Sequence, residues 1–461
     1  MDNFARDDRT VSLLARDMDS TDIGALIDGR PLSPFQVRLL VLVGCLVLMD
    51  GFDVQVIGFV APALLRSWNL PPDALGPIFG AGLLGMLVGS TGLGTLADRI
   101  GRRPVLIGAT FFVALCVLLT AAARSVPQML ALRFLTGVGL GGVLGNAITL
   151  ASEYCPSARR ASLLMGISCG FTAGAILGGL LAAVLIPRTG WQSVFIAGGL
   201  LPLGVAILLV RELPESLQLL LVRGADRVQI EYWLKRLAPE VAVSPTTAIQ
   251  LPEIAPGKVS VIDLFRAGLG MRSLLLWAAS FANLLNLFFL SNWLPLLATR
   301  MGYSDSLGVL LGTTLQAGGI VGALTLGRCI DRFGFYRVLA PSFLLGAAMI
   351  AAIGQPALPV VVECVVVLFA GIAILGGQPG INALATSVYP TQLRATGVGW
   401  CLGIGRAGSI VGPMAAAQLI AHHFTNDVLF IFAAVPAAIS SLLIAGMAKT
   451  QPRCERSLLP L

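Results

Sequence analysis

Twelve long apolar stretches, separated by short charged segments, are the feature that most constrains how this chain folds. Each is about 20 residues long, the length that an α-helix needs to cross the hydrocarbon core of a bilayer. Only 12% of the 461 residues are charged, about half the share in an average soluble domain. So few charges do not cover a water-soluble surface, which excludes a soluble enzyme. The sequence predicts an all-α polytopic membrane protein with twelve transmembrane helices.

The twelve spans form two sets of six on either side of a polar segment. The first set is predicted at 39–63, 76–96, 104–123, 127–150, 161–186 and 191–210. The second set is predicted at 272–297, 306–328, 336–354, 358–384, 395–420 and 427–447. The chain then divides into a cytoplasmic N-terminal segment 1–38, a bundle 39–210, a cytoplasmic central loop 211–271, a bundle 272–448 and a cytoplasmic tail 449–461. In the loop, residues 215–223 and 227–237 are expected to form an amphipathic helical piece.

The positions of the 31 lysines and arginines predict the orientation. Two of them lie inside spans, 25 lie in segments on one face, and only four lie in loops on the other face: Arg66, Arg124, Arg188 and Arg300. Because positive residues are retained on the cytoplasmic side, both termini are predicted to be cytoplasmic. The net charge of +7 is therefore spread along one membrane face and does not indicate nucleic-acid binding.

The two halves are related by an internal repeat with an offset of 233 residues. The pattern G-x3-D-R-x-G follows the second span and returns after the eighth. Two parallel halves predict a pseudo-two-fold axis along the membrane normal, with the substrate path between them. We predict that these loops act as a conformational switch at the cytoplasmic gate, although their arginines are also explained by topology alone. The switch residues are Gly94, Asp98, Arg99, Gly101, Arg102, Arg103, Asp331 and Arg332.

Two carboxylates lie near the middle of the first span. Asp50 and Asp53 are three residues apart, so they share one face of a helix. A charge at the bilayer centre costs about 2.5–3.5 kcal/mol on insertion scales and therefore marks function. Burial and mutual repulsion favour the protonated acids, so we expect this pair to carry the coupled protons. The alternative is structural, with a kink at Gly51 and both acids paired to fixed arginines.

Two arginines lie within spans and keep their charge there. Arg133 lies about 9 Å from the predicted external end of its span, and Arg406 lies about 17 Å from the predicted cytoplasmic end, at 1.5 Å per residue. Three interpretations stay open: an ion pair with Asp50 or Asp53, an anion site, or snorkelling, which suits Arg133 better. We favour carboxylate binding at Arg406, with Arg133 as the second candidate.

Polar and aromatic residues in the spans are candidates for contact with the substrate. The repeat maps Asp50 and Asp53 onto Asn283 and Asn286, which keep the polarity without the charge. Interhelical packing is the alternative for each. The other candidates are Phe52, Asn146, Phe288, Phe289, Trp293, Gln316, Gln378, Asn382 and Trp400. The eight cysteines show no metal-binding spacing, and His422 and His423 have no further His or Cys nearby, so no metal or cofactor is predicted.

Several motifs resemble a known family. The first span reads Asp50-Gly51-Phe52-Asp53 and continues with Gly58-Phe59-x-Ala61-Pro62, which resembles the aromatic acid/proton symporters of the major facilitator superfamily. The eleventh span, with Gly405-Arg406 and Gly412-Pro413, is similar to the same family, and the doubled loop motif resembles the superfamily as a whole. One departure is Gly334-Phe335-Tyr336 in the second loop, where the first loop has Gly101-Arg102-Arg103.

The resemblance covers nearly the whole chain and implies the major facilitator fold in a cytoplasmic (inner) membrane. It implies uptake of an aromatic carboxylate of the hydroxybenzoate or benzoate type by proton symport, with the first-span acids essential. The fifth span lacks the Gly-Pro step of antiporters, which also favours symport. We expect a monomeric transporter driven by the proton gradient without a cofactor, and not an enzyme. A carrier for another small organic anion and a transporter-like solute sensor remain alternatives.

Overall fold

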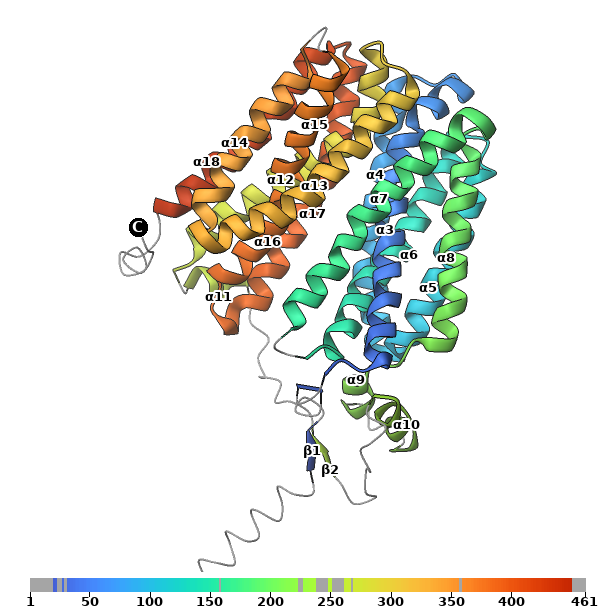
Figure 1. Ribbon diagram of the computed structural model, residues 1–461, viewed down its shortest axis with the longest axis vertical. Coiled ribbons are helices and arrows are strands. Elements are labelled where there is room, and N and C mark those ends of the chain that lie inside the picture. Colours follow the sequence, from blue (N-terminus) through green and yellow to red (C-terminus); the bar gives the residue numbers. More distant parts are fainter. Residues whose placement is uncertain are drawn as a thin grey trace, which may run out of the picture.

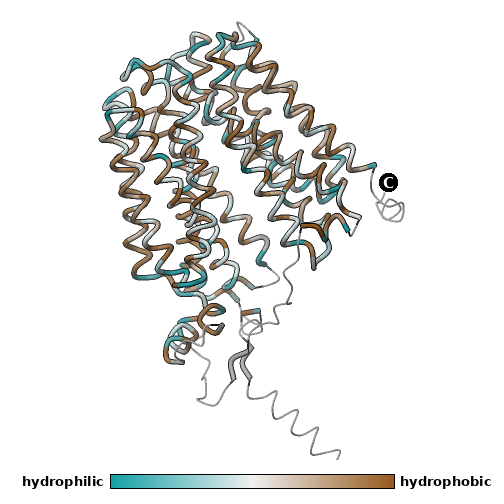
Figure 2. The backbone as a smooth tube through the Cα atoms, turned by 180° about the vertical axis from the view of Figure 1, so that it is seen from behind, coloured by the Kyte–Doolittle hydropathy of each residue, from teal (hydrophilic) through white to brown (hydrophobic). Residues whose placement is uncertain are grey.

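The computed structural model describes residues 20–22, 27–28, 31–156, 159–222, 227–237, 248–250, 261–266, 268–355 and 359–449. In this part of the chain nearly all residues lie in helices, and the long helices form two bundles that lie side by side (Figure 1). Hydrophobic residues predominate along the long helices, and hydrophilic residues gather towards their ends (Figure 2). The prediction of an all-α membrane protein with two six-helix bundles is confirmed.

The first bundle begins at Ser33, whose hydroxyl accepts the Gln36 N–H while the Gln36 side chain accepts the Ser33 N–H at 2.8 Å. This capping box starts the first long helix. A short 3-10 turn, η1 (Pro72–Ala74), leads into the second. The six helices are α3 (Pro34–Trp68), α4 (Leu75–Ile100), α5 (Arg102–Ala121), α6 (Val126–Glu153), α7 (Arg160–Thr189) and α8 (Gln192–Glu212).

The second bundle contains one broken span. Its helices are α12 (Gly270–Arg300), α13 (Asp305–Phe333), α14 (Phe335–Ile353), α15 (Val360–Ile374), α16 (Gly377–Val388), α17 (Thr391–Ala421) and α18 (Asn426–Lys449). The predicted tenth span is thus two helices, α15 and α16. Pro379 has no N–H to donate to the Leu375 carbonyl, so the regular ladder is interrupted there. The break is at Leu375 and Gly376, and Gln378 is the second residue of α16.

Eleven of the twelve spans in the described residues are long and apolar enough to cross a membrane by length and composition. The twelfth, α17, is 31 residues long. Its hydropathy is lower because it contains Arg406 and several glycines. The helix that resembles a lipid-facing span least therefore carries a positive charge near its middle.

The central segment forms the short helices α9 (Leu217–Val222) and α10 (Arg227–Leu237) at one end of the first bundle, and α11 (Val261–Arg266), which contacts α12 and α17 of the second bundle (Figure 1). From the N-terminal segment, β1 (Ser20–Asp22) pairs in parallel with β2 (Ala248–Gln250). The predicted helical piece at 227–237 is confirmed by α10. The Arg236 guanidinium lies 5.8 Å from the Phe35 ring centroid and 5.7 Å from that of Trp233. These cation–π contacts attach α10 to the start of α3.

The two bundles meet closely at one end and diverge toward the other, where α9 and α10 lie (Figure 1). At the closed end, backbone meets backbone or small side chains across the halves. A Cβ atom on Gly58 would lie 2.8 Å from the Ser291 carbonyl oxygen, and one on Gly179 would lie 2.1 Å from the Thr313 hydroxyl. The diverging end carries the basic loops and is the predicted cytoplasmic end.

Inside the first bundle, α3 and α7 are in direct backbone contact beside the first-span acids. A Cβ atom on Gly51 would lie 1.8 Å from the Phe171 carbonyl oxygen, and one on Gly174 would lie 1.8 Å from the Leu48 carbonyl oxygen. Real Cβ atoms do not approach so closely, so both positions require glycine. Gly51 thus allows α7 to pack against the helix that carries Asp50.

This contact predicts that Gly51→Ala destabilises the protein, by about 1–3 kcal/mol for an overpacked site. Gly44→Ala is the matched control, because it adds the same methyl group to α3 at a position with no atom within 4 Å of its Cβ. The melting temperature of the purified protein in detergent measures both variants. Equal melting temperatures for the two variants would contradict the close α3–α7 contact.

Candidate functional site

A cavity of about 330 Å³ lies between the two bundles, within the usual size range of small-molecule sites. Both halves contribute to its wall. The first bundle contributes Asp50, Gln55, Ser168, Phe171 and Thr172, and the second contributes Phe288, Gln316, Gln378, Asn382 and Arg406, among others. The cavity is thus at the interface that the internal repeat predicts for the substrate path.

Asp50 is a buried acid without a partner. It is 0% exposed, and neither carboxylate oxygen has a hydrogen-bond partner among the described residues. The charge of Arg406, on the opposite bundle, attracts it, and that of Asp53 repels it. A buried, unpartnered carboxylate is costly, so this environment favours the neutral acid when no cation is close. Asp50 therefore has the environment of a proton-binding group at a cavity wall.

Asp53 is in a different environment, because it is paired with Arg133. The two Arg133 guanidinium NH groups lie 3.2 Å from the carboxylate oxygens, and both side chains are buried. The guanidinium also lies 5.1 Å from the Phe195 ring centroid. Of the three interpretations of Arg133, the structure shows the ion pair with Asp53, and snorkelling is wrong because Arg133 is only 3% exposed.

The structure brings only some of the predicted substrate residues together. Five of them line the central cavity: Phe288, Gln316, Gln378, Asn382 and Arg406. Other candidates lie outside its wall: the Asn146 amide donates to the Gly142 carbonyl at 2.7 Å, Phe289 packs against Phe430, and Trp400 stacks on Trp277. Asn286 is buried in α12, and its amide atoms have no hydrogen-bond partner among the described residues. Their roles in binding stay predictions.

The polar pair that the repeat maps onto the acids has a structural contact in the second half. The Asn283 amide donates to the Gln378 side-chain oxygen at 2.8 Å, and the Gln378 amide donates to Asn382 at 3.2 Å. Asn283 thus orients Gln378, which follows the break between α15 and α16. The mapped asparagine positions a cavity residue and does not itself line the wall.

Several residues of the cavity wall were not among the candidates from the sequence, Gln55 and Phe171 among them. Gln55 is 1% exposed, and its amide atoms have no partner among the described residues. A glutamine five residues after Asp50 in an apolar span was a usable signal, since polar groups inside a membrane are costly. Phe171 had none, because it is one of many phenylalanines in apolar spans.

The first loop motif is held by two acids from other parts of the bundle. Arg102 forms an ion pair with Glu153, at the end of α6. The Glu215 carboxylate accepts the backbone N–H groups of Arg102 at 2.9 Å and Arg103 at 3.3 Å. Gly101 has a φ of +118°, a conformation that favours glycine. The motif therefore joins the ends of α4, α5 and α6 to the segment after α8.

Tyr154 adds a further hydrogen bond to these contacts around Glu215. Its hydroxyl donates to the Glu215 backbone carbonyl at 2.7 Å. Burial, with the nearby Glu215 charge, raises the pKa of the Tyr154 phenol, so it stays a neutral donor. Glu153 and Glu215 are functional candidates that the sequence analysis did not identify. An acid at the very end of the fourth span and one in the Pro214-Glu215 turn after the sixth were the available signals.

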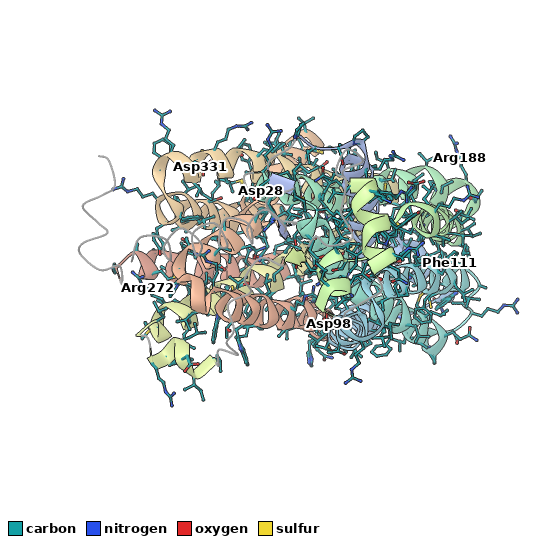
Figure 3. The ribbon with its side chains drawn as sticks, turned by 90° about the horizontal axis from the view of Figure 1, so that it is seen from below. Asp28, Asp98, Phe111, Arg188, Arg272 and Asp331 are labelled. Atoms are coloured by element: carbon teal, nitrogen blue, oxygen red, sulfur yellow. The ribbon has the colours of Figure 1, made fainter. Side chains whose placement is uncertain are left out.

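The second loop motif differs from the first. Asp331 and Arg332 are exposed, and the Arg332 guanidinium lies over the neighbouring Phe333 ring, 5.4 Å from its centroid. Figure 3 views the molecule from this end and labels Asp98 in the first bundle and Asp331 in the second. The charged contacts of the predicted switch are thus concentrated in the first half, consistent with the sequence departure after Gly334.

The fold and the site define a two-bundle membrane transporter with its cavity between the halves. The sequence matches the Major Facilitator Superfamily over residues 43–400 and 276–458. The chain belongs to this superfamily and is not an enzyme. Its structure is similar to that of a bacterial homologue of the human lysosomal transporter Spinster, with a TM-score of 0.70, 18% identity and coverage of 91% of this chain and 98% of that one.

The relatives found by sequence are more similar to this chain than the structural neighbour is. The chain is 38% identical to the 4-hydroxybenzoate transporter PcaK of Pseudomonas aeruginosa, covering 92% of this chain and 96% of the relative. It is also 38% identical to the gallate transporter of Pseudomonas putida, covering 92% and 94%. The resemblance to the aromatic acid transporters of the superfamily is confirmed.

The buried ion pair predicts different effects on stability for substitutions of the two first-span acids. Asp53→Asn leaves Arg133 charged and unpaired, which costs about 3–5 kcal/mol, whereas Asp50→Asn removes an unpartnered acid and leaves stability nearly unchanged or raised. Melting temperatures of the purified variants measure this difference. Adding Arg133→Gln to Asp53→Asn restores most of the loss; equal destabilisation by the two single variants would contradict the pairing.

The hydrogen bonds from the first loop to Glu215 predict that Glu215→Ala destabilises the start of α5. Two backbone N–H groups lose their charged acceptor, so hydrogen exchange of a peptide covering 101–105 becomes about tenfold faster. Glu212→Ala is the control, because Glu212 forms only partly exposed ion pairs, with Arg38 at 3.5 Å and Arg236 at 3.8 Å. Unchanged hydrogen exchange in Glu215→Ala would contradict the stabilisation of the start of α5 by the Glu215 carboxylate.

Proposed function

We propose that this protein imports an aromatic carboxylate of the hydroxybenzoate or benzoate type by proton symport through alternating access. The observation that carries the proposal is a buried, unpartnered acid and an arginine on opposite walls of one cavity, Asp50 on α3 and Arg406 on α17. The similarity to transporters of 4-hydroxybenzoate and gallate supports the substrate class. The position of the cavity between the two halves supports alternating access.

The charges of the cavity explain why proton and substrate move together. In the empty carrier, ionised Asp50 and Arg406 sum to zero. In the loaded carrier, protonated Asp50, Arg406 and a bound carboxylate again sum to zero. A carrier with only the proton or only the anion holds a net charge between the bundles, and desolvating that charge is costly. The carrier changes readily between its outward-facing and inward-facing forms only in these two neutral states, and this couples one proton to one carboxylate.

The walls of the cavity suit an aromatic ring. Phe171 from the first bundle and Phe288 from the second are apolar surfaces for its faces, and such ring contacts add to the burial energy. Gln316, Gln378 and Asn382 provide amide groups for ring hydroxyls. In this arrangement Arg406 takes the carboxylate, while Arg133 stays paired with Asp53. A coupling role for Asp53 requires that Arg133 release it elsewhere in the cycle.

The same proposal includes the location and the driving force. We place the protein in the cytoplasmic (inner) membrane with both termini in the cytoplasm, as the distribution of basic residues indicates. The substrate path lies within one chain, so a monomer suffices. The proton gradient drives the cycle, and no cofactor or nucleic acid takes part.

The charge argument predicts electroneutral uptake. In proteoliposomes with an inward pH gradient and the membrane potential clamped at zero, radiolabelled 4-hydroxybenzoate or benzoate is expected to accumulate several-fold. A potential alone, without a pH gradient, is expected to drive no accumulation. Aliphatic acids such as succinate serve as the comparison for substrate class.

Three outcomes would contradict parts of this proposal. Accumulation independent of the pH gradient removes proton symport, and equal uptake of succinate removes the aromatic specificity. Accumulation driven by the potential alone requires more than one proton per carboxylate. Arg406→Ala is expected to weaken substrate binding at least tenfold, the usual scale for a lost charge-assisted pair; unchanged binding would remove Arg406 as the anion site.

A further inference from the structure

A second, larger cavity lies at the closed end of the molecule, opposite the diverging end. Its volume is about 670 Å³. The ends of α3 and α7, the turn into α8 and the start of α13 form its wall, so both bundles contribute. The described functional site uses none of its residues.

An ion pair between the halves forms one side of this cavity. Arg66, in the last turn of α3, donates both NH groups to the carboxylate of Asp305, the first residue of α13, with one bond of 2.7 Å. The side chains are 59% and 35% exposed. The pair therefore joins the two bundles at the predicted external end and is accessible to solvent.

The remaining wall is mainly apolar. Phe59, Ile186, Trp191 and Val309 line it. The Trp191 indole N–H donates to the Ser67 hydroxyl at 3.0 Å, and its ring packs edge-on against Trp68 at 5.7 Å. A guanidinium beside fixed aromatic surfaces has the chemistry that recognises an aromatic carboxylate.

We propose that Arg66 is an external capture site at which the aromatic carboxylate displaces Asp305. The incoming carboxylate forms the same two-bonded pair with Arg66 that Asp305 forms, so the exchange has little net cost. The released Asp305 stays in the first turn of α13, where water and the helix dipole stabilise its charge. Capture thereby breaks the ion pair between the bundles and couples arrival of the substrate to opening of the closed end. This inference rests on the proposed function.

The test separates capture from a purely mechanical latch. A latch is broken equally by Arg66→Gln and by Asp305→Asn, so both variants then change the external KM in the same direction. Capture predicts that the two variants change the external KM in opposite directions. Arg66→Gln removes the carboxylate partner and raises the KM for external 4-hydroxybenzoate about three- to fivefold, while Asp305→Asn removes the competitor and lowers it by a similar factor. Arg66→Lys keeps the positive charge without the planar guanidinium, so its KM is expected to lie between those of the parent and of Arg66→Gln.

Arg188→Gln is the matched control. Arg188 lies in the last turn of α7 and is exposed at the rim of the bundle in Figure 3, so it reports the loss of one external positive charge without a role in the cavity wall. Its KM is expected to stay within twofold of the parent. Shifts of the same sign in Arg66→Gln and Asp305→Asn, or no shift in either, overturn the inference. Absence of aromatic acid uptake by the parent protein overturns the proposed function instead.

Discussion

The rest of the structure is arranged around one unfavourable interaction, a carboxyl group buried in the middle of a membrane helix without a hydrogen-bond partner among the described residues. Asp50 has this environment at the wall of the cavity between the bundles. Its charge is tolerable only when Arg406 is free to compensate it, and a bound carboxylate removes that compensation by occupying Arg406. Protonation of Asp50 is then the less costly state. Coupling follows from this competition for one positive charge.

The rest of the first bundle keeps Asp50 apart from other partners. Three residues further on, Asp53 is already neutralised by Arg133, 3.2 Å away, so it does not compete for Arg406. Gly51 and Gly174 bring α3 and α7 into backbone contact, which holds the Asp50 helix rigidly beside the cavity. Close contacts such as Gly58 against Ser291 seal the predicted external end, so the described state diverges at the predicted cytoplasmic end.

Much of the fold was predictable because membrane spans are encoded locally by length and apolarity. The internal repeat placed the cavity between the halves, and the cost of buried charge identified Asp50, Asp53 and Arg406. Which individual side chains point into the cavity was not predictable, since a helix that is apolar all round has no sequence signal for the side that faces the cavity. Phe289 and Trp400 therefore lie in aromatic packing contacts, whereas Phe288 and Phe171 line the wall.

Partnerships between distant residues were also beyond local patterns. Arg133 pairs with Asp53 because α6 packs beside α3, and Glu215 reaches the loop at Arg102 because the chain turns back after α8. Neither distance follows from spacing along the sequence. The repeat indicated two equivalent switch loops, but acidic partners at the end of α6 and in the segment after α8 give the first loop contacts that Asp331 and Arg332 lack in the described part of the second.

A comparison of exchange with net uptake in Asp50→Asn tests the coupling role of Asp50 most directly. With a permanently neutral residue 50, the loaded cavity is still uncharged, but the empty cavity carries the charge of Arg406. We predict that proteoliposomes with this variant exchange internal for external 4-hydroxybenzoate at a rate near that of the parent, yet do not accumulate it under a pH gradient. Accumulation comparable to that of the parent protein would contradict the coupling role of Asp50.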